Sequence, residues 1–162
     1  MADKLLNLKN LEIEFDNEDG TVHAVNGASI QIDTGQSIGI VGESGCGKSV
    51  TAFSILQLLP PLGKITNGKI EYYKADGEVL NLANLGSESK EMRKIRGAEI
   101  SMVFQEPLSA FSPVYTVGNQ ISESIILHQG MQKKEARERA IELLNKVGIS
   151  KPSERVDEYY FQ

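Results

Sequence analysis

The stretch that decides the fold is Gly42-Glu43-Ser44-Gly45-Cys46-Gly47-Lys48-Ser49, a glycine followed after four residues by Gly-Lys-Ser. Glycines let a loop aim successive backbone N–H groups at an anion. An apolar run at 37–41 precedes the loop, and a helical stripe of apolar residues at 48–59 follows it. A strand, a glycine loop and a helix in this order predict a phosphate-binding loop, with the positive end of the helix facing the anion.

The residue types of this loop match the needs of a nucleotide. Lys48 is predicted to reach the β- and γ-phosphates as a positive charge, and the Ser49 hydroxyl to ligate Mg²⁺. Cys46 is interpreted as a small residue that fits the loop; a thiol made acidic by the helix N-terminus is the alternative. The predicted nucleotide contacts in this region are Gly42, Glu43, Ser44, Gly45, Cys46, Gly47, Lys48, Ser49 and Val50.

The segments before and after the loop predict an α/β protein. Strands at 11–15 and 22–32 are expected to pair in antiparallel fashion across a short turn, and 70–73 with 78–82 to form a hairpin. The short apolar runs 37–41 and 100–104 are typical of strands buried in a mostly parallel sheet.

The last third of the chain predicts helices. A loop with a short helix is expected at 84–96, and Thr116 is the expected N-cap of a helix at 117–129. A second amphipathic helix is expected at 133–147, with Gly148 as its C-terminal cap. Its inward residues are predicted to be Ala136, Ala140, Ile141, Leu144 and Val147.

Composition excludes several classes of protein. The 162 residues carry a net charge of −5 and a single cysteine. The negative net charge disfavours sequence-independent binding to nucleic-acid phosphates. A single cysteine cannot form an internal disulfide. The sequence has no run of 18 apolar residues, so no membrane span is predicted. The first residues lack the apolar core of a signal peptide. We expect a cytoplasmic domain.

Gln105 is the second candidate site residue. If the strand at 100–104 lies beside the loop strand, Gln105 ends it at the same crevice and can offer its amide oxygen to Mg²⁺ or to an attacking water. A solvated glutamine at the end of an edge strand is the alternative interpretation.

The phosphate loop, together with Ile100-Ser101-Met102-Val103-Phe104-Gln105-Glu106-Pro107, resembles the ATPase subunits of ABC transporters. Lys94-Ile95-Arg96-Gly97 and Pro113-Val114-Tyr115-Thr116-Val117-Gly118 narrow the resemblance to the ATPase subunits of oligopeptide and dipeptide importers. The resemblance covers nearly the whole chain and is most specific at 94–121.

The resemblance implies an α/β fold with an incomplete P-loop NTPase core. On this basis 1–162 would be the N-terminal portion of an ABC ATPase domain. Its antiparallel β-subdomain would comprise 1–36 and 66–83, and its P-loop core 37–60 and 98–105. The Q-loop and the start of the α-helical subdomain would occupy 106–162.

The resemblance also implies roles for residues outside the loop. Gln105 would be the Q-loop residue, a Mg²⁺ ligand with Ser49 that couples the nucleotide site to the membrane subunits, and 106–117 would lie near the surface that docks the permease. Phe15 looks like the aromatic residue that stacks on adenine, although an ordinary place in the core is equally consistent. His23 is a weaker candidate neighbour of the base.

The implied function is binding of ATP and Mg²⁺ to energise uptake of peptides. The implied partners are transmembrane permease subunits, a second ATPase subunit and, indirectly, a solute-binding protein, with no nucleic acid. The implied location is cytoplasmic, peripheral on the cytoplasmic face of the cell membrane.

The chain also departs from the family. It has no Ser-Gly-Gly signature, no Walker B strand ending in Asp-Glu and no switch histidine, so no catalytic residue is assigned. We therefore expect a fragment that binds ATP but does not hydrolyse it, although the complete protein would be an ATPase. A different P-loop enzyme, such as a small-molecule kinase, and a non-catalytic nucleotide-binding module remain as alternatives.

Overall fold

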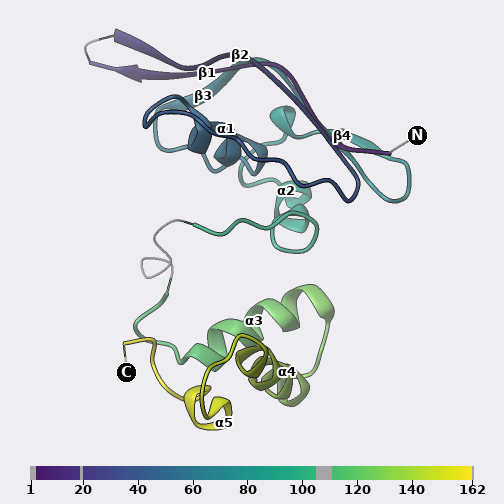
Figure 1. The fold of residues 1–162 in the computed structure, drawn as a ribbon, viewed down its shortest axis with the longest axis vertical. Coiled ribbons are helices and arrows are strands. Elements are labelled where there is room, and N and C mark those ends of the chain that lie inside the picture. Colours follow the sequence, from purple (N-terminus) through teal and green to yellow (C-terminus); the bar gives the residue numbers. More distant parts are fainter. Residues whose placement is uncertain (1–2, 19, 105–110, 162) are drawn as a thin grey trace. The chain divides into compact units, whose positions relative to one another are not determined.

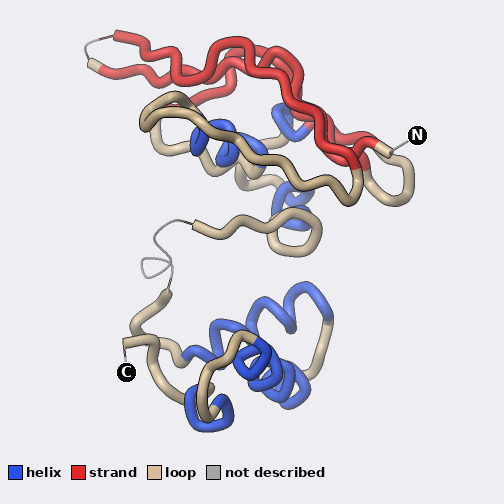
Figure 2. The backbone as a smooth tube through the Cα atoms, in the orientation of Figure 1, coloured by secondary structure: helices blue, strands red, loops and turns tan. Residues whose placement is uncertain are grey.

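The computed structural model describes residues 3–18, 20–104 and 111–161. The chain divides into two compact units, Met1–Arg96 and Gly97–Gln162. The first unit contains a β-sheet with short helices, and the second is helical (Figure 1, Figure 2). The α/β fold class expected from the sequence is confirmed.

The sheet of the first unit has four antiparallel strands in the order β2-β1-β3-β4. The long hairpin of β1 (Lys4–Asn17) and β2 (Gly20–Asp33) is completed by β3 (Gly63–Tyr73) and the short β4 (Val79–Asn81). Both antiparallel pairs predicted from the sequence are therefore present, and β1 begins earlier than the alternation at 11–15 indicated.

An irregularity in the middle of β1 explains this difference. Asn10 has a φ of 46°, and the register with β3 shifts between Lys9 and Glu12. One extra residue reverses which side chains face the core. Leu8 precedes the irregularity and Leu11 follows it at an odd spacing, yet both are buried. The simple alternation visible in the sequence therefore starts only after Asn10.

One face of the sheet is covered by the helices of the first unit (Figure 1). These are α1 (Lys48–Ile55), the 3-10 turn η1 (Leu82–Asn84) and α2 (Lys90–Ile95). The interior between helices and strands is apolar, as hydrophobic burial requires. Its most deeply buried apolar side chains are Leu8, Leu11, Ile13, Ile70, Leu82, Met92 and Ile95.

The second unit contains α3 (Val117–Gln129), α4 (Lys133–Lys146) and α5 (Pro152–Arg155). The Thr116 hydroxyl accepts a hydrogen bond from the backbone N–H of Asn119, which confirms the predicted N-cap. Gly148 follows α4 with a φ of 81° and donates its N–H to the Asn145 carbonyl, as predicted for a C-terminal cap.

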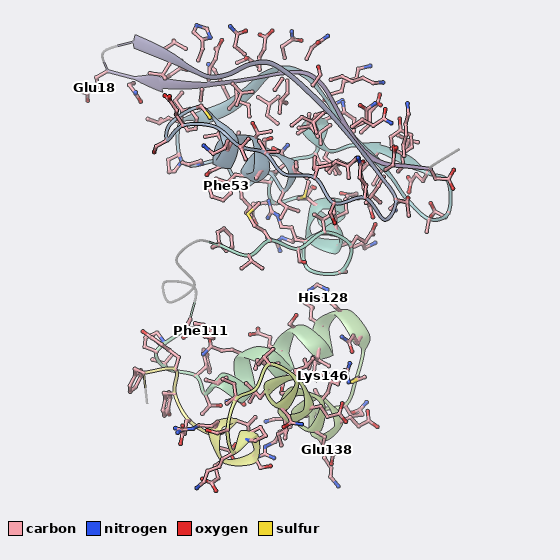
Figure 3. The ribbon with its side chains drawn as sticks, in the orientation of Figure 1. Glu18, Phe53, Phe111, His128, Glu138 and Lys146 are labelled. Atoms are coloured by element: carbon pink, nitrogen blue, oxygen red, sulfur yellow. The ribbon has the colours of Figure 1, made fainter. Side chains whose placement is uncertain are left out.

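The core of the second unit lies between α3, α4 and the turn after α5. Ala140, Leu144 and Val156 are buried together. The backbone N–H of Gly118 donates to the carbonyl of Val156 at 2.8 Å, an approach that a larger residue would block. The opposite face of α4 is polar, and Glu138 and Lys146 on it are exposed (Figure 3).

Four predictions about elements are wrong. The segments 37–41 and 100–104 are not strands: Val41 is 93% exposed and Val103 is 95% exposed, and only Ile100 forms an isolated bridge. Within the described residues, the sheet consists of β1 to β4, so neither segment has the neighbouring strands that a buried strand requires.

The other two errors concern helix ends and faces. The helix expected at 48–59 ends at Ile55, because Gln57 has a φ of 53° and leaves the helical path before Pro60. Val147, predicted to point inward, is 74% exposed and lies just beyond the end of α4.

Candidate phosphate-binding site

The glycine loop at 42–47 leads directly into α1, as the sequence predicted (Figure 2). Gly47 is the N-cap of α1 and has a φ of 89°, a left-handed conformation that side chains rarely adopt. A Cβ atom on Gly47 would lie 2.5 Å from the carbonyl oxygen of Ala24 and 3.2 Å from the Val25 side chain. The absence of a side chain therefore lets the loop sit directly on β2.

Lys48 folds back over the loop. Its Nζ donates hydrogen bonds to the carbonyl oxygens of Gly42 at 2.8 Å and Glu43 at 2.6 Å, and it lies 3.5 Å from Cys46 Sγ. An ammonium group has three donors. Here they contact Gly42 and Glu43 at the start of the loop and Cys46 near its end. A positive charge is thus held inside the loop, at the N-terminal end of a helix, where phosphate oxygens are favoured.

Two buried residues of α1 support the loop and were not singled out from the sequence. The Thr51 hydroxyl donates to the Gly47 carbonyl at 2.9 Å, and the Ser54 hydroxyl donates to the Thr51 carbonyl at 2.7 Å. In helices, serine and threonine hydroxyls often donate a hydrogen bond to a backbone carbonyl of the preceding turn. Their spacing was visible in the sequence, but their burial depends on the sheet.

Ser49 and Val50 occupy the first turn of α1, with Ser49 exposed and Val50 half-buried. The Ser49 hydroxyl is an oxygen donor of the kind that Mg²⁺ prefers, so the residue fits the role predicted for it. In the part of the chain that the structure describes, no three histidine, cysteine, aspartate or glutamate side chains gather as a metal site. Glu43, Ser44, Gly45 and Cys46 complete the exposed rim of the loop.

Phe15 lies on the face of the sheet that meets the loop. Residues paired directly across antiparallel strands point to the same face. Phe15 pairs with Val22, and Ile13, two residues earlier on β1, pairs with Val25. Val25 is the residue that approaches Gly47. Phe15 is half-buried and therefore shares a face with the support of the phosphate loop.

His23 lies on the other face. It pairs with Glu14, and its Nδ1 is 3.0 Å from the Glu14 carboxylate. Successive residues of a strand point to opposite faces, so Glu14 and His23 point away from the face of Phe15. Of the two residues considered for the adenine, the structure brings Phe15 and not His23 to the loop side of the sheet.

An ion pair flanks Phe15 at the end of the hairpin. Lys64 Nζ donates to the Asp16 carboxylate at 2.6 Å, and the Thr21 hydroxyl donates to it at 3.0 Å. These hydrogen bonds, the lysine first, lower the pKa of Asp16, and the same contact raises the pKa of Lys64. Asp16 is therefore charged at neutral pH and fixed to β3.

Gln105 and the following residues to 110 lie outside the described part of the chain. The structure therefore does not place the predicted Q-loop residue, and its proposed contacts with Mg²⁺ stay predictions. A separate groove of about 860 Å³ lies in the second unit, lined among others by Ile126, Leu127, Lys133 and Arg137, and it shares no residue with the phosphate loop. Of the described helices, none is long and apolar enough to cross a membrane.

Sequence comparison relates the chain to a known family. The ABC transporter family matches residues 25–162. The chain is 46% identical over 161 residues to the dipeptide transport ATP-binding protein DppD of Bacillus subtilis (strain 168), covering 99% of the chain and 46% of that protein. It is 42% identical over 158 residues to a probable peptide ABC transporter ATP-binding protein of Sinorhizobium fredii, covering 98% of the chain and 45% of that protein. The chain thus spans about half the length of these relatives.

A solved structure shares the fold. The chain superposes with a TM-score of 0.78 on a dimeric, post-hydrolysis ATP-binding cassette bound to ADP and Pi, covering 98% of this chain and 62% of that chain at 24% identity. This likeness shows the fold, and it is consistent with part of a P-loop NTPase. Since the family match extends over most of the residues, the phosphate loop included, the chain belongs to the ABC transporter family.

Proposed function

We propose that this chain binds the phosphates of MgATP at residues 42–49 and is the ATP-binding part of an importer that takes up peptides. The observation that carries the proposal is the position of Lys48, whose ammonium group is held by the carbonyls of Gly42 and Glu43 at the start of α1. Phosphate oxygens entering the loop would take over this cation and also meet the positive end of the helix.

Each residue of the site has a proposed task. Lys48 neutralises phosphate charge, and Gly42, Gly45 and Gly47 keep the loop open to the phosphates. Ser49 holds Mg²⁺, which when bound would screen the negative charge between the phosphates. Phe15 stacks on the base, supported by its place on the loop side of the sheet. Gln105 senses the γ-phosphate and metal.

The peptide substrate rests on the names of the relatives, which are dipeptide and peptide transport proteins. We propose that the complete protein hydrolyses ATP, pairs with a second ATPase subunit and docks on permease subunits at the cytoplasmic face of the membrane. A solute-binding protein would deliver the substrate. The dimeric state of the cassette that shares the fold supports the pairing.

We propose further that the 162-residue chain binds MgATP without turnover. Hydrolysis needs a residue that positions water and full ligation of the metal, in addition to a phosphate loop. No residue of this sequence is assigned as a catalytic base. Release of phosphate that depends on Lys48 would contradict this part of the proposal.

The single cysteine provides a direct test of phosphate binding. Cys46 is exposed within the loop, so an alkylating reagent such as N-ethylmaleimide reports on this site alone. We expect MgATP to slow alkylation of the wild-type chain, followed by intact-mass spectrometry, because bound phosphates cover the loop. In Lys48→Ala, MgATP should give little protection. Equal labelling rates with and without saturating MgATP in the wild type would contradict the site.

A further inference from the structure

The C-terminal end of α1 is held by a residue far away in the sequence. Arg96 Nε donates to the Leu56 carbonyl at 2.8 Å, and its Nη2 donates to the Gln57 carbonyl at 3.0 Å. Both contacts lie within the first unit. We propose that Arg96 is a positioning residue for the phosphate loop, which it acts on through α1.

The chemistry of the contact favours arginine specifically. The last carbonyls of a helix have no partner within the helix and carry partial negative charge, so a cation is stabilising there. A guanidinium group presents its N–H donors in a planar fork that can meet two acceptors at once. Lysine offers the same charge without the fork. The geometry therefore uses both the charge and the shape of Arg96.

The end of the helix is also unusual in its backbone. Leu56 has already left the helical conformation, and Gln57 has a φ of 53°, a left-handed value for a residue that is not glycine. The Gln57 side chain donates to the carbonyl of Leu82 in η1 at 2.9 Å. A left-handed conformation at a residue other than glycine persists only where its surroundings hold it. Here the hydrogen bonds with Arg96 and Leu82 hold it.

Arg96 itself is anchored. It follows α2 directly, and the α2 residues Met92 and Ile95 are fully buried. The Ser89 side chain caps the start of α2 by accepting from the Met92 N–H. The guanidinium group is thus carried by a packed element and not by a loose surface loop.

The other end of α1 is the phosphate site. The helix has only eight residues, so its two ends move as one short rod. One end rests on β2 through Gly47, and the other is held by Arg96. Releasing the second end would let the rod tilt, which changes where Lys48 and the first N–H groups of the helix point.

This inference rests on the proposed ATP binding, and its test separates the two. Arg96→Gln and Arg96→Lys are compared with Arg93→Gln, which removes an exposed arginine of α2 paired with Glu88. Kd for MgATP is measured by calorimetry well below the lowest unfolding temperature of the set. We expect Arg96→Gln to raise Kd about tenfold, within the usual range of coupling between sites. Arg96→Lys should raise it less, and Arg93→Gln should leave it unchanged.

Amide hydrogen exchange without nucleotide provides the second readout. Arg96→Gln should speed exchange at 51–55, whose amides are bonded within α1, more than in the buried part of β1, because the effect is local to α1. A lowered melting temperature with wild-type Kd and an even rise in exchange would overturn the inference and leave a structural role alone. Failure of the wild-type chain to bind MgATP would instead contradict the proposed function, while the exchange data would still decide the role of Arg96.

Discussion

Gly47 shows how a single residue decides the geometry of the site. Its left-handed backbone and its contact with the Ala24 carbonyl both exclude a side chain. The motif in the sequence predicted a glycine here because the loop must turn tightly around phosphates. The close approach of Gly47 to Ala24 of β2 was not predictable, because these two residues lie far apart in the sequence.

Gly47→Ala should therefore destabilise the chain more than Gly45→Ala, a matched change in the same loop. Gly45 also has a positive φ, of 84°, but a Cβ there would meet nothing within 4 Å. Left-handed backbone alone costs about 1 kcal/mol, and we expect the clash at Gly47 to bring the loss of unfolding free energy to about 3 kcal/mol. Urea unfolding of both variants measures the difference. Equal losses would mean that the contact with β2 is unimportant.

Elements that depend on local signals were predictable from the sequence. The cap at Thr116 and the glycine at 148 act within a few residues, and both are found where the pattern placed them. The β1–β2 hairpin is local in the same sense. By contrast, 37–41 and 100–104 were predicted as strands from their composition, although a strand exists only with partners that composition does not reveal.

The candidate site divides in the same way. The loop and Lys48 could be identified from spacing, because their function depends on neighbours in the sequence. Thr51 and Arg96 support the loop through contacts that only the fold creates. The choice between Phe15 and His23 required the register of β1 and β2, which a pattern of apolar residues does not fix across the irregularities of this hairpin.

The β1–β3 pair predicts a dependence of stability on pH. The Glu71 carboxylate accepts from Lys9, Tyr73 and Asn7, and these hydrogen bonds, the lysine first, lower its pKa. A folded-state pKa below the unfolded value gives stability that is present above about pH 4.3, the ordinary value for glutamate. That stability is lost as the pH falls through the lowered pKa.

We expect the urea midpoint of the first unit to fall as the pH is lowered from about 6 to about 3. Glu71→Gln should flatten this dependence and lower the midpoint at neutral pH. Glu18→Gln, in the exposed turn between β1 and β2, is the control and should follow the wild type. A Glu71→Gln curve parallel to the wild-type curve would show that this carboxylate does not contribute.

For the whole molecule, the exposed apolar segments predict self-association. Val41 and Val103 are almost fully exposed, in segments that form no strand within the described residues. Exposed apolar stretches favour association with another chain. The average mass from sedimentation equilibrium should rise with protein concentration.

The double variant Val41→Ser and Val103→Ser should reduce that rise. Val79→Ser is the control, because it removes a half-exposed valine from β4, which is already paired with β3. A wild-type chain that stays monomeric over the whole concentration range would contradict this expectation.

The central claim is that residues 42–49 bind the phosphates of MgATP through Lys48. The most direct test is calorimetric titration of MgATP into the wild-type chain, Lys48→Ala and Lys94→Ala, which removes an exposed lysine of α2. We predict saturable binding by the wild type and Lys94→Ala and a Kd raised at least about tenfold in Lys48→Ala, since an ion pair with phosphate is lost. Equal binding by all three proteins, or none by the wild type, would contradict the account.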